Sequence, residues 1–172
     1  IGGSSGGELV LNLASRFDHF NAVIAMSTSN VSFPAITWSS NTSSWTCKGE
    51  EIPYVPAPLK TILPALKGDL YTAHKMMLKD KEASKKAEIQ VENINGAILI
   101  LSGKNDDQWP ASEMSDQLIK RLKSKDFKYY NKHIKLDGGH IAPLEHFNLV
   151  YDFLDKYLPT EVTKPVANTV YN

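Results

Sequence analysis

The sequence predicts an α/β fold in which helices cover a parallel β-sheet. Two apolar runs, Ala22 to Ser27 and Ala97 to Ser102, suit strands that are buried on both faces, as in parallel sheets. A third strand is predicted at Tyr129 to Leu136, where aromatic and β-branched residues occur. Helical patterns alternate with these strands along the chain, and this alternation is typical of a parallel sheet.

Three helices are predicted around the strands. The first begins at Glu8 and runs through an apolar stretch to Phe17. The others cover Ser112 to Lys123 and Glu145 to Tyr157, and the latter carries an apolar stripe typical of a helix that packs on a sheet. The polar tail after Pro159 is expected to be loose.

The segment between the first two buried strands, residues 28–95, is too long for a plain crossover connection. We therefore expect a cap, inserted into a single domain that covers residues 1–172. Within it, Ser44 to Val55 has the pattern of a hairpin around Lys48 and Gly49. Three aromatic side chains of this segment are candidates either for an acyl pocket or for the cap's own core: Trp38, Trp45 and Tyr54.

The chain begins with a Gly-x-Ser-x-Gly motif at Gly2, Ser4 and Gly6. This motif is typical of a nucleophile elbow, a tight strand-to-helix turn that lifts the serine hydroxyl clear of the sheet and excludes flanking side chains. Glycine and serine clusters also form ordinary loops and phosphate-binding loops, so the motif alone leaves the role of Ser4 open. Because the strand before an elbow is missing from this sequence, we expect the chain to be part of a longer polypeptide or to need a partner.

Acid and base candidates follow the motif in the order that a hydrolase triad requires, Ser, then Asp or Glu, then His. Asp106 and Asp107 come just after the second buried strand, where ligands of doubly wound sheets bind, although Asp is also common in turns and helix caps. His140 follows the last strand and a glycine turn. In this hypothesis Ser4 attacks a carbonyl, His140 takes and returns its proton, and Asp106 orients the imidazole.

Several segments, beginning with the elbow, together resemble one family, the C-terminal domain of acyl-CoA thioester hydrolases and bile acid-CoA:amino acid N-acyltransferases. The resemblance is to bacterial members of this family, which is dienelactone-hydrolase-like. The segments are Gly2 to Leu9, Leu13 to Phe17, Ser43 to Thr46, Ile52 to Pro56, Val91 to Gly96, Gly103 to Pro110, Ser112 to Ser115, and Gly139 with His140. The resemblance spans almost the whole chain. It implies an α/β-hydrolase fold from the elbow onward, with the N-terminal half of the sheet absent from this chain.

The resemblance also implies roles for individual residues. Ser4 corresponds to the nucleophile, Asp106 to the acid and His140 to the base. The family usually shows an Asp-Asp pair directly after Gly-x, whereas here Asn105 precedes the pair, so Asp107 stays as the alternative acid. In the fold that is implied, the backbone N–H of Ser5 donates to the oxyanion.

A serine nucleophile in this family is associated with hydrolysis of the thioester by water, and a cysteine with acyl transfer to an amino acid. We therefore expect an acyl-CoA thioesterase that forms an acyl-Ser4 intermediate. An acyl-CoA:amino acid N-acyltransferase and a general carboxylesterase are alternatives on the same fold. A non-catalytic hydrolase-fold module that binds a ligand is an alternative of another class.

Composition bounds the remaining possibilities. Lys and Arg match Asp and Glu, so the net charge of zero gives no sign of a nucleic-acid surface. Cys47 is the single cysteine, which excludes an intramolecular disulfide, fits a reducing, cytoplasmic compartment and is expected to pack as a small side chain. The basic stretch Lys75 to Lys86 suits a solvated helix face, or a surface that attracts the phosphates of coenzyme A.

The expected partner is a small acyl-CoA or ester substrate, and no cofactor or metal is expected. No apolar run has the length of a membrane span. Without the strand before the elbow, the strand Ala22 to Ser27 is expected to present an unpaired edge, which favours association into a homo-oligomer.

Overall fold

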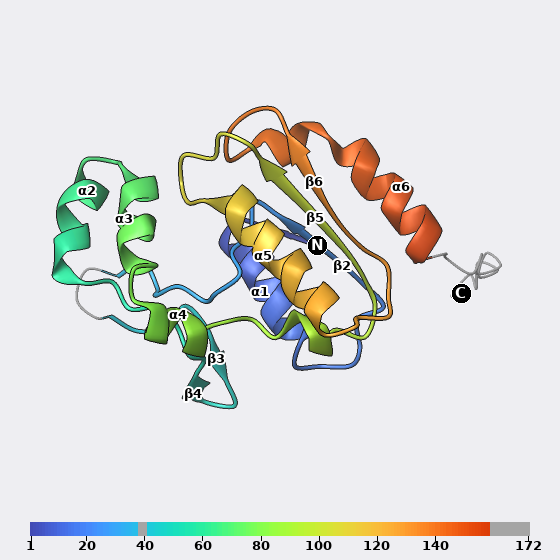
Figure 1. Cartoon of the computed structure of the whole chain (residues 1–172), viewed down its shortest axis with the longest axis horizontal. Helices are drawn as coiled ribbons and strands as arrows, with labels where there is room; N and C mark the ends of the chain where they lie inside the picture. Colours follow the sequence, from blue (N-terminus) through green and yellow to red (C-terminus); the bar gives the residue numbers. More distant parts are fainter. Residues whose placement is uncertain (38–40, 159–172) are drawn as a thin grey trace, which may run out of the picture.

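The computed structural model describes residues 1–37 and 41–158, so Trp38 and the tail after Pro159 lie outside the described residues. Its centre is a four-stranded sheet in the order β1-β2-β5-β6, with every neighbouring pair parallel (Figure 1). The strands are β1 (Gly2–Gly3), β2 (Ala22–Met26), β5 (Ala97–Gly103) and β6 (Asn131–Leu136). The predicted parallel sheet and its three longer strands are confirmed.

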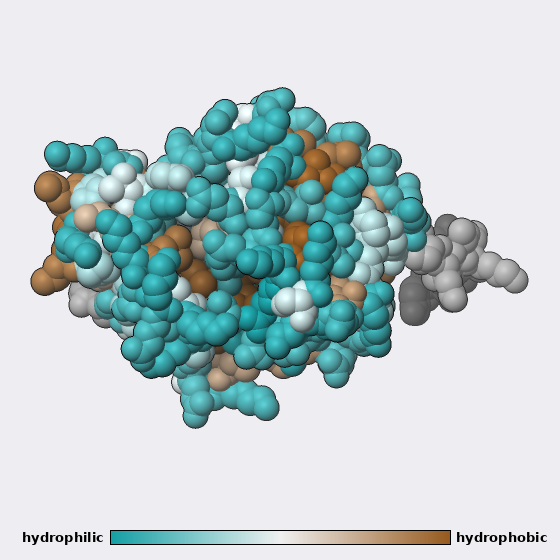
Figure 2. All heavy atoms as spheres, in the orientation of Figure 1, coloured by the Kyte–Doolittle hydropathy of each residue, from teal (hydrophilic) through white to brown (hydrophobic). Residues whose placement is uncertain are grey.

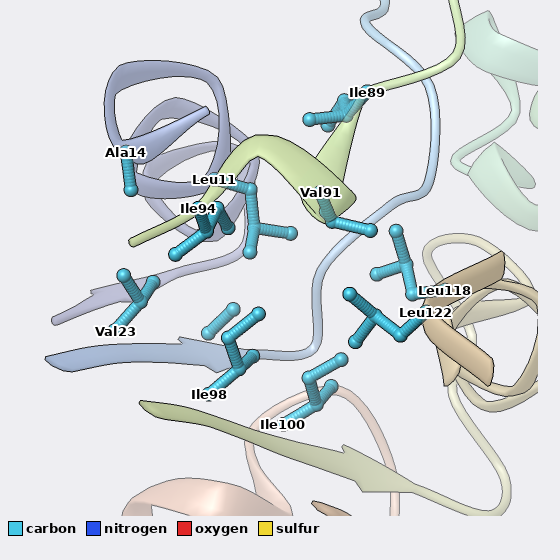
Figure 3. Packing of buried hydrophobic residues seen from close by; sticks show 11 residues of the cluster. Leu11, Ala14, Val23, Ile89, Val91, Ile94, Ile98, Ile100, Leu118 and Leu122 are labelled. Carbon is cyan, nitrogen blue, oxygen red and sulfur yellow. The ribbon is translucent and has the colours of Figure 1, made fainter. Parts of the chain in front are cut away.

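Helices cover both faces of this sheet. On one face, α1 (Ser5–Ala14) and α5 (Ala111–Ser124) pack on Val23 and Ile98, and Figure 3 shows this cluster from close by. On the other face, α6 (Phe147–Tyr157) packs on Ile24 and Leu99, after a 3₁₀ turn at Ala142–Glu145. Successive strand residues point to opposite faces, so a continuous apolar run supplies both clusters.

Most of the segment between β2 and β5 forms a group of small elements beside the sheet, at the left of Figure 1, whereas its last part, with Ile89, Val91 and Ile94, packs in the cluster between α1, α5 and the sheet (Figure 3). Its hairpin consists of β3 (Thr46–Cys47) and β4 (Glu50–Glu51), and the turn residues Lys48 and Gly49 have φ angles of 54° and 85°. Positive φ at both central residues is the geometry of the favoured two-residue hairpin turn. The predicted hairpin is therefore confirmed at its predicted turn.

Four short helical elements and a further 3₁₀ turn complete this segment. They are the 3₁₀ turn Leu59–Thr61, α2 (Ile62–Leu66), α3 (Leu70–Met77), α4 (Lys81–Lys86) and the 3₁₀ turn Val91–Asn93. The basic stretch Lys75 to Lys86 therefore spans two helices, because the Asp80 side chain accepts a hydrogen bond from the Ala83 N–H and starts α4 afresh.

A third apolar cluster joins this segment to the loop after β5 and to α5. Val31, Phe33 and Val55 of the segment pack there with Trp109 and Met114, from the loop after β5 and from α5. Away from this contact, α2 and the 3₁₀ turn before it carry exposed apolar side chains, which are brown at the left edge of Figure 2: Leu59, Ile62, Leu63 and Leu66. No helix within residues 1–37 and 41–158 has both the length and the apolar character to cross a membrane.

Candidate active site

Ser4 occupies a sharp turn between β1 and α1. Its φ and ψ angles are 56° and −127°, a conformation that costs a residue with a side chain about 1–3 kcal/mol. The Ser4 N–H donates to the carbonyl of Met26 at 2.8 Å, and the Ser4 carbonyl accepts from the N–H groups of Gly7 and Glu8. The neighbouring strand and the first turn of the helix therefore hold the strained conformation in place.

The glycines of the motif serve different purposes. A Cβ added at Gly2 would lie 2.1 Å from the carbonyl oxygen of Gly6, so no side chain fits there. A Cβ added at Gly6 would meet nothing within 4 Å, so the prediction that a side chain would clash there is wrong. The close approach occurs instead at Gly7, where a Cβ would lie 3.0 Å from the Cβ of Thr28.

The structure brings Ser4, His140 and Asp106 together. His140 Nε2 lies 2.9 Å from Ser4 Oγ, and His140 Nδ1 lies 2.8 Å from Asp106 Oδ2. In a neutral ring, the carboxylate holds the proton on Nδ1, which leaves the lone pair of Nε2 facing the serine hydroxyl. The three residues follow the carboxyl ends of β1, β5 and β6, which all meet at one edge of the parallel sheet.

The two neighbouring acids differ in position. Asp106 is 8% exposed, and its second oxygen, Oδ1, accepts hydrogen bonds from the backbone N–H groups of Gln108 and Trp109 at 2.9 and 3.3 Å. Asp107 is exposed, and its Oδ1 accepts a hydrogen bond from Gln108 Nε2. The geometry therefore selects Asp106 as the partner of His140, and Asp106 is at the same time the turn residue of the loop.

Two residues that the sequence did not single out support the histidine. Ser27, with φ at 43°, donates from Oγ to the backbone carbonyl of His140 at 2.6 Å. Trp109 donates from Nε1 to the carbonyl of Ser27, and its ring meets the His140 ring edge-on with centroids 5.3 Å apart. A polar residue at the end of a buried strand was the only sequence signal for Ser27.

His74 of α3 reaches the loop that carries the acid. Its Nδ1 lies 2.9 Å from the carbonyl oxygens of both Leu70 and Gln108, so Nδ1 carries the proton that these acceptors need. Burial lowers the pKa of His74, which keeps the ring neutral near pH 7. The same ring packs edge-on against Phe33 and Trp109, so α3 is held against the acid loop by both polar and aromatic contacts.

Space for a ligand exists beside the acid loop, and backbone donors exist at the elbow. A cavity of about 270 Å³ is lined by Tyr71, Lys104, Asp106 and Asp107, among others. Ser5 is the first residue of α1, so its N–H is one of the four at a helix start that have no partner within the helix. This position lies at the positive end of the helix dipole.

The remaining candidates have other contacts. Tyr54 donates its hydroxyl to the carbonyl of Asn41, and Trp45 donates its indole N–H to Glu8 Oε1 at 2.6 Å. Cys47 is half-buried in β3 and forms no disulfide. Within the described part of the chain, no group of three or more His, Cys, Asp or Glu side chains is arranged to hold a metal ion.

Several lysines of the basic stretch pair with acidic side chains on the surface. Lys75 contacts Glu113 at 3.2 Å, and Lys86 contacts Glu82 at 2.7 Å. These exposed pairs fit the solvated helix face that the sequence predicts.

Glu8 is a buried acid that the sequence pattern indicated only as the start of a helix. It is 2% exposed, and its burial raises its pKa from 4.5 to about 7 against the opposing effect of neutral hydrogen-bond donors. The signal in the sequence was a glutamate directly before an apolar helical run, where most positions face a core.

Comparisons with known proteins agree with this architecture. A family model described as BAAT / Acyl-CoA thioester hydrolase C terminal matches residues 1–150. A search of curated proteins finds no match. Among solved structures, acylaminoacyl peptidase in complex with Z-Gly-Gly-Phe-chloromethyl ketone is similar, with a TM-score of 0.55 and 16% identity over 95% of this chain.

The uncomplexed acylaminoacyl peptidase of Pyrococcus horikoshii gives a TM-score of 0.54, with 17% identity over 95% of this chain. The chain spans about a quarter of the length of these structures, 24% and 25% respectively. At such identities the likeness shows the α/β-hydrolase fold alone.

Proposed function

The chain belongs to the BAAT / acyl-CoA thioester hydrolase C-terminal family, and we propose that it acts as a serine hydrolase of acyl-CoA thioesters. Membership and fold support a hydrolase or acyltransferase. The observation that carries the serine mechanism is the distance of 2.9 Å between His140 Nε2 and Ser4 Oγ, with Asp106 on the other ring nitrogen. Water as the acceptor is favoured by serine, rather than cysteine, at the elbow.

In the proposed reaction, Ser4 Oγ attacks the thioester carbonyl while His140 Nε2 takes the hydroxyl proton. The tetrahedral intermediate collapses, the C–S bond breaks, and His140 returns the proton to the departing thiolate of coenzyme A. A water molecule then attacks the acyl-Ser4 ester with His140 as base, which releases the free acid and restores the serine. The N–H of Ser5 stabilises the oxyanion in both steps.

We also propose that residues 28–95 form the cap over this site, within one domain. The segment follows β2 beside the triad edge, and His74 of its helix α3 bonds to the carbonyl of Gln108 in the acid loop. This position suits a role in holding the acyl part of the substrate.

Labelling with a serine-directed fluorophosphonate tests the nucleophile. We expect labelling of the full-length protein and its loss in Ser4→Ala. Ser5→Ala is the matched control, because it removes the neighbouring hydroxyl and keeps the backbone N–H, so its labelling is expected to remain. No labelling of the folded full-length protein, or equal labelling of Ser4→Ala, would contradict the proposal and favour a non-catalytic module.

The substrate class is tested with acyl-CoAs of graded chain length, with and without glycine or taurine. We expect release of free acid and coenzyme A in both cases. An amide product would contradict hydrolysis and assign acyl transfer, and turnover of simple esters alone would assign a carboxylesterase.

A further inference from the structure

Glu8 places a carboxyl group in the contact between the nucleophile helix and the cap. It lies one turn after Ser4 in α1, and its backbone N–H donates to the Ser4 carbonyl at 3.2 Å. The residue is 2% exposed, and among the described residues its side-chain hydrogen bonds include none with a triad side chain. Its hydrogen bonds lead instead to residues 28–95.

Two neutral donors of the cap end on this carboxyl group. The indole N–H of Trp45 donates to Oε1 at 2.6 Å, and the backbone N–H of Phe33 lies 3.3 Å from each oxygen. Two charged side chains on neighbouring elements have other partners: Arg16, just after α1, donates to Asn12, and Glu51 of β4 accepts from the N–H of Ser43. The carboxyl group is thus held by neutral donors alone among the described contacts.

The serine side chains Ser29 and Ser32 also hydrogen-bond to this carboxyl group, and Ser29 indicates where a proton on Glu8 would lie. Ser29 Oγ is 3.3 Å from Glu8 Oε2 but only 2.6 Å from the carbonyl oxygen of Val31. A hydroxyl has one hydrogen, and the shorter bond to the carbonyl takes it. A protonated Glu8 can then donate from Oε2 to the free lone pair of Ser29 Oγ, while Oε1 accepts from Trp45.

The next turn of the helix repeats the contact. Asn12, four residues after Glu8, is 1% exposed and donates from Nδ2 to Ser32 Oγ at 2.9 Å. Residues four apart lie on the same helix face, so α1 presents two buried polar groups in line to the start of the cap. Of these two, only Glu8 also reaches the hairpin, through Trp45.

We infer that Glu8 is a positioning residue that fixes the cap, through Trp45 and Phe33, on the helix that carries the nucleophile. This inference rests on the proposed function for its kinetic consequence, which is control of substrate binding rather than of the chemical step. The bonds that join Ser4 to His140 and His140 to Asp106 include no atom of Glu8, and the described side-chain contacts of Glu8 lie on the hairpin and on residues 29–33, so its loss acts first on this part of the cap. The inference itself concerns a contact that is measurable without any activity.

The kinetic test compares four variants with acyl-CoA as substrate. Glu8→Ala and Trp45→Phe each remove one side of the hydrogen bond, and we expect each to raise KM roughly tenfold, as for a lost buried hydrogen bond, with kcat within about twofold. The double variant is expected to show no further loss, because both changes remove the same contact. Glu8→Gln keeps an acceptor for Trp45 and a donor for Ser29, so it is expected to restore KM.

The matched control is Glu50→Gln, which neutralises an exposed carboxyl group in the same hairpin and is expected to leave KM unchanged. A fall in kcat at constant KM in Glu8→Ala, fully additive effects in the double variant, or no rescue by glutamine would each overturn the inference.

A spectroscopic test separates the inference from the proposed function. The indole ¹⁵N–H resonance of Trp45, assigned by its loss in Trp45→Phe, is expected to shift with pH as Glu8 ionises and to stay constant in Glu8→Gln. This outcome is expected even if no acyl-CoA is hydrolysed. An indole resonance that does not titrate in the unsubstituted chain, or that still titrates in Glu8→Gln, would overturn the inference and leave the hydrolase proposal standing.

Discussion

Replacing Gly103 by alanine addresses the contact between the two loops that carry Asp106 and His140. Gly103 is the last residue of β5, and a Cβ there would lie 2.0 Å from the carbonyl oxygen of Gly139. The backbone of these loops is also joined by a hydrogen bond from the Asn105 N–H to the carbonyl of Gly138 at 3.0 Å. A methyl group at this position therefore pushes on the residue directly before His140.

The size of the expected fall in kcat follows from the distance between the added Cβ and the Gly139 carbonyl oxygen. Real Cβ atoms essentially never come closer than 3.0 Å to such an atom, so the carbonyl of Gly139 must move by about 1 Å or the strand must shift by as much. A misplacement of about 1 Å in a catalytic group costs on the order of 10²-fold in rate. We expect Gly103→Ala to lower kcat by about that factor.

The assay is steady-state hydrolysis of an acyl-CoA, combined with the rate of fluorophosphonate labelling at Ser4. Gly139→Ala is the matched control, because a Cβ at Gly139 would lie 3.6 Å from its nearest atom, an ordinary contact. The control is expected to keep its rate within about threefold, given that no close contact is created. Thermal unfolding of both variants establishes that the chains compared are folded.

Full activity in a folded Gly103→Ala variant would refute the reasoning, because it would mean that the loops yield without moving His140. Equal losses in the two variants would refute it as well, since the distances separate them. A loss confined to Gly103→Ala, with slower labelling of Ser4, is the expected result.

Three further outcomes are expected. Asp106→Asn should lower kcat by about 10³- to 10⁴-fold through the wrong imidazole tautomer, whereas Asp107→Asn should change it less than about twofold in the same kinetic assay. The pKa of Glu8 is about 7 in the folded chain and 4.5 in the unfolded chain, so the stabilisation by its proton is fully present below pH 4.5 and is lost as the pH rises through 7. Urea unfolding should show that the free energy of unfolding falls by about 3 kcal/mol over this range, and that this fall is absent in Glu8→Gln. Leu118→Ala should lower the free energy of unfolding by about 2–5 kcal/mol at any pH, because Leu118 is 1% exposed in the core beneath α5.

The centre of the sheet was predictable from the sequence because its two middle strands, β2 and β5, are buried on both faces. The sequence has an unbroken apolar run at Ala97 to Ser102, and every residue of β5 is buried in the structure. β1 was not predictable in this way, since Gly2 and Gly3 carry no side chains that could show a pattern. Their pairing with Ala25 and Met26 depends on the register of another strand.

The start of α1 also departs from the sequence pattern for a physical reason. The apolar pattern begins after Glu8, and glycine lowers helix propensity, so the expected helix began there. The helix begins instead at Ser5, because Gly7 lies against Thr28, and Ser4 must present its carbonyl to the N–H groups of Gly7 and Glu8. Close packing thus outweighs propensity at this position.

The contacts of Glu8 and Ser27 were not predicted, because the partner of each is distant in the sequence. Trp45 meets Glu8 across 37 positions, and Ser27 meets His140 across 113. A local sequence pattern does not predict such a pair, and a serine or a glutamate among apolar residues occurs in many structural roles. The three triad candidates could be predicted because Ser4 lies in the Gly-x-Ser-x-Gly motif, whereas Asp106 and His140 each follow a predicted strand, and parallel strands end at a common edge.

Asp106 can be a turn residue and the partner of His140 at the same time, so these two interpretations do not exclude each other. A carboxylate has two oxygens with separate lone pairs. Oδ1 of Asp106 closes the loop on the N–H groups of Gln108 and Trp109, and Oδ2 faces His140. The turn therefore fixes the orientation that the histidine requires, and evidence for a capping aspartate at the end of a buried strand is also evidence for a rigidly held acid.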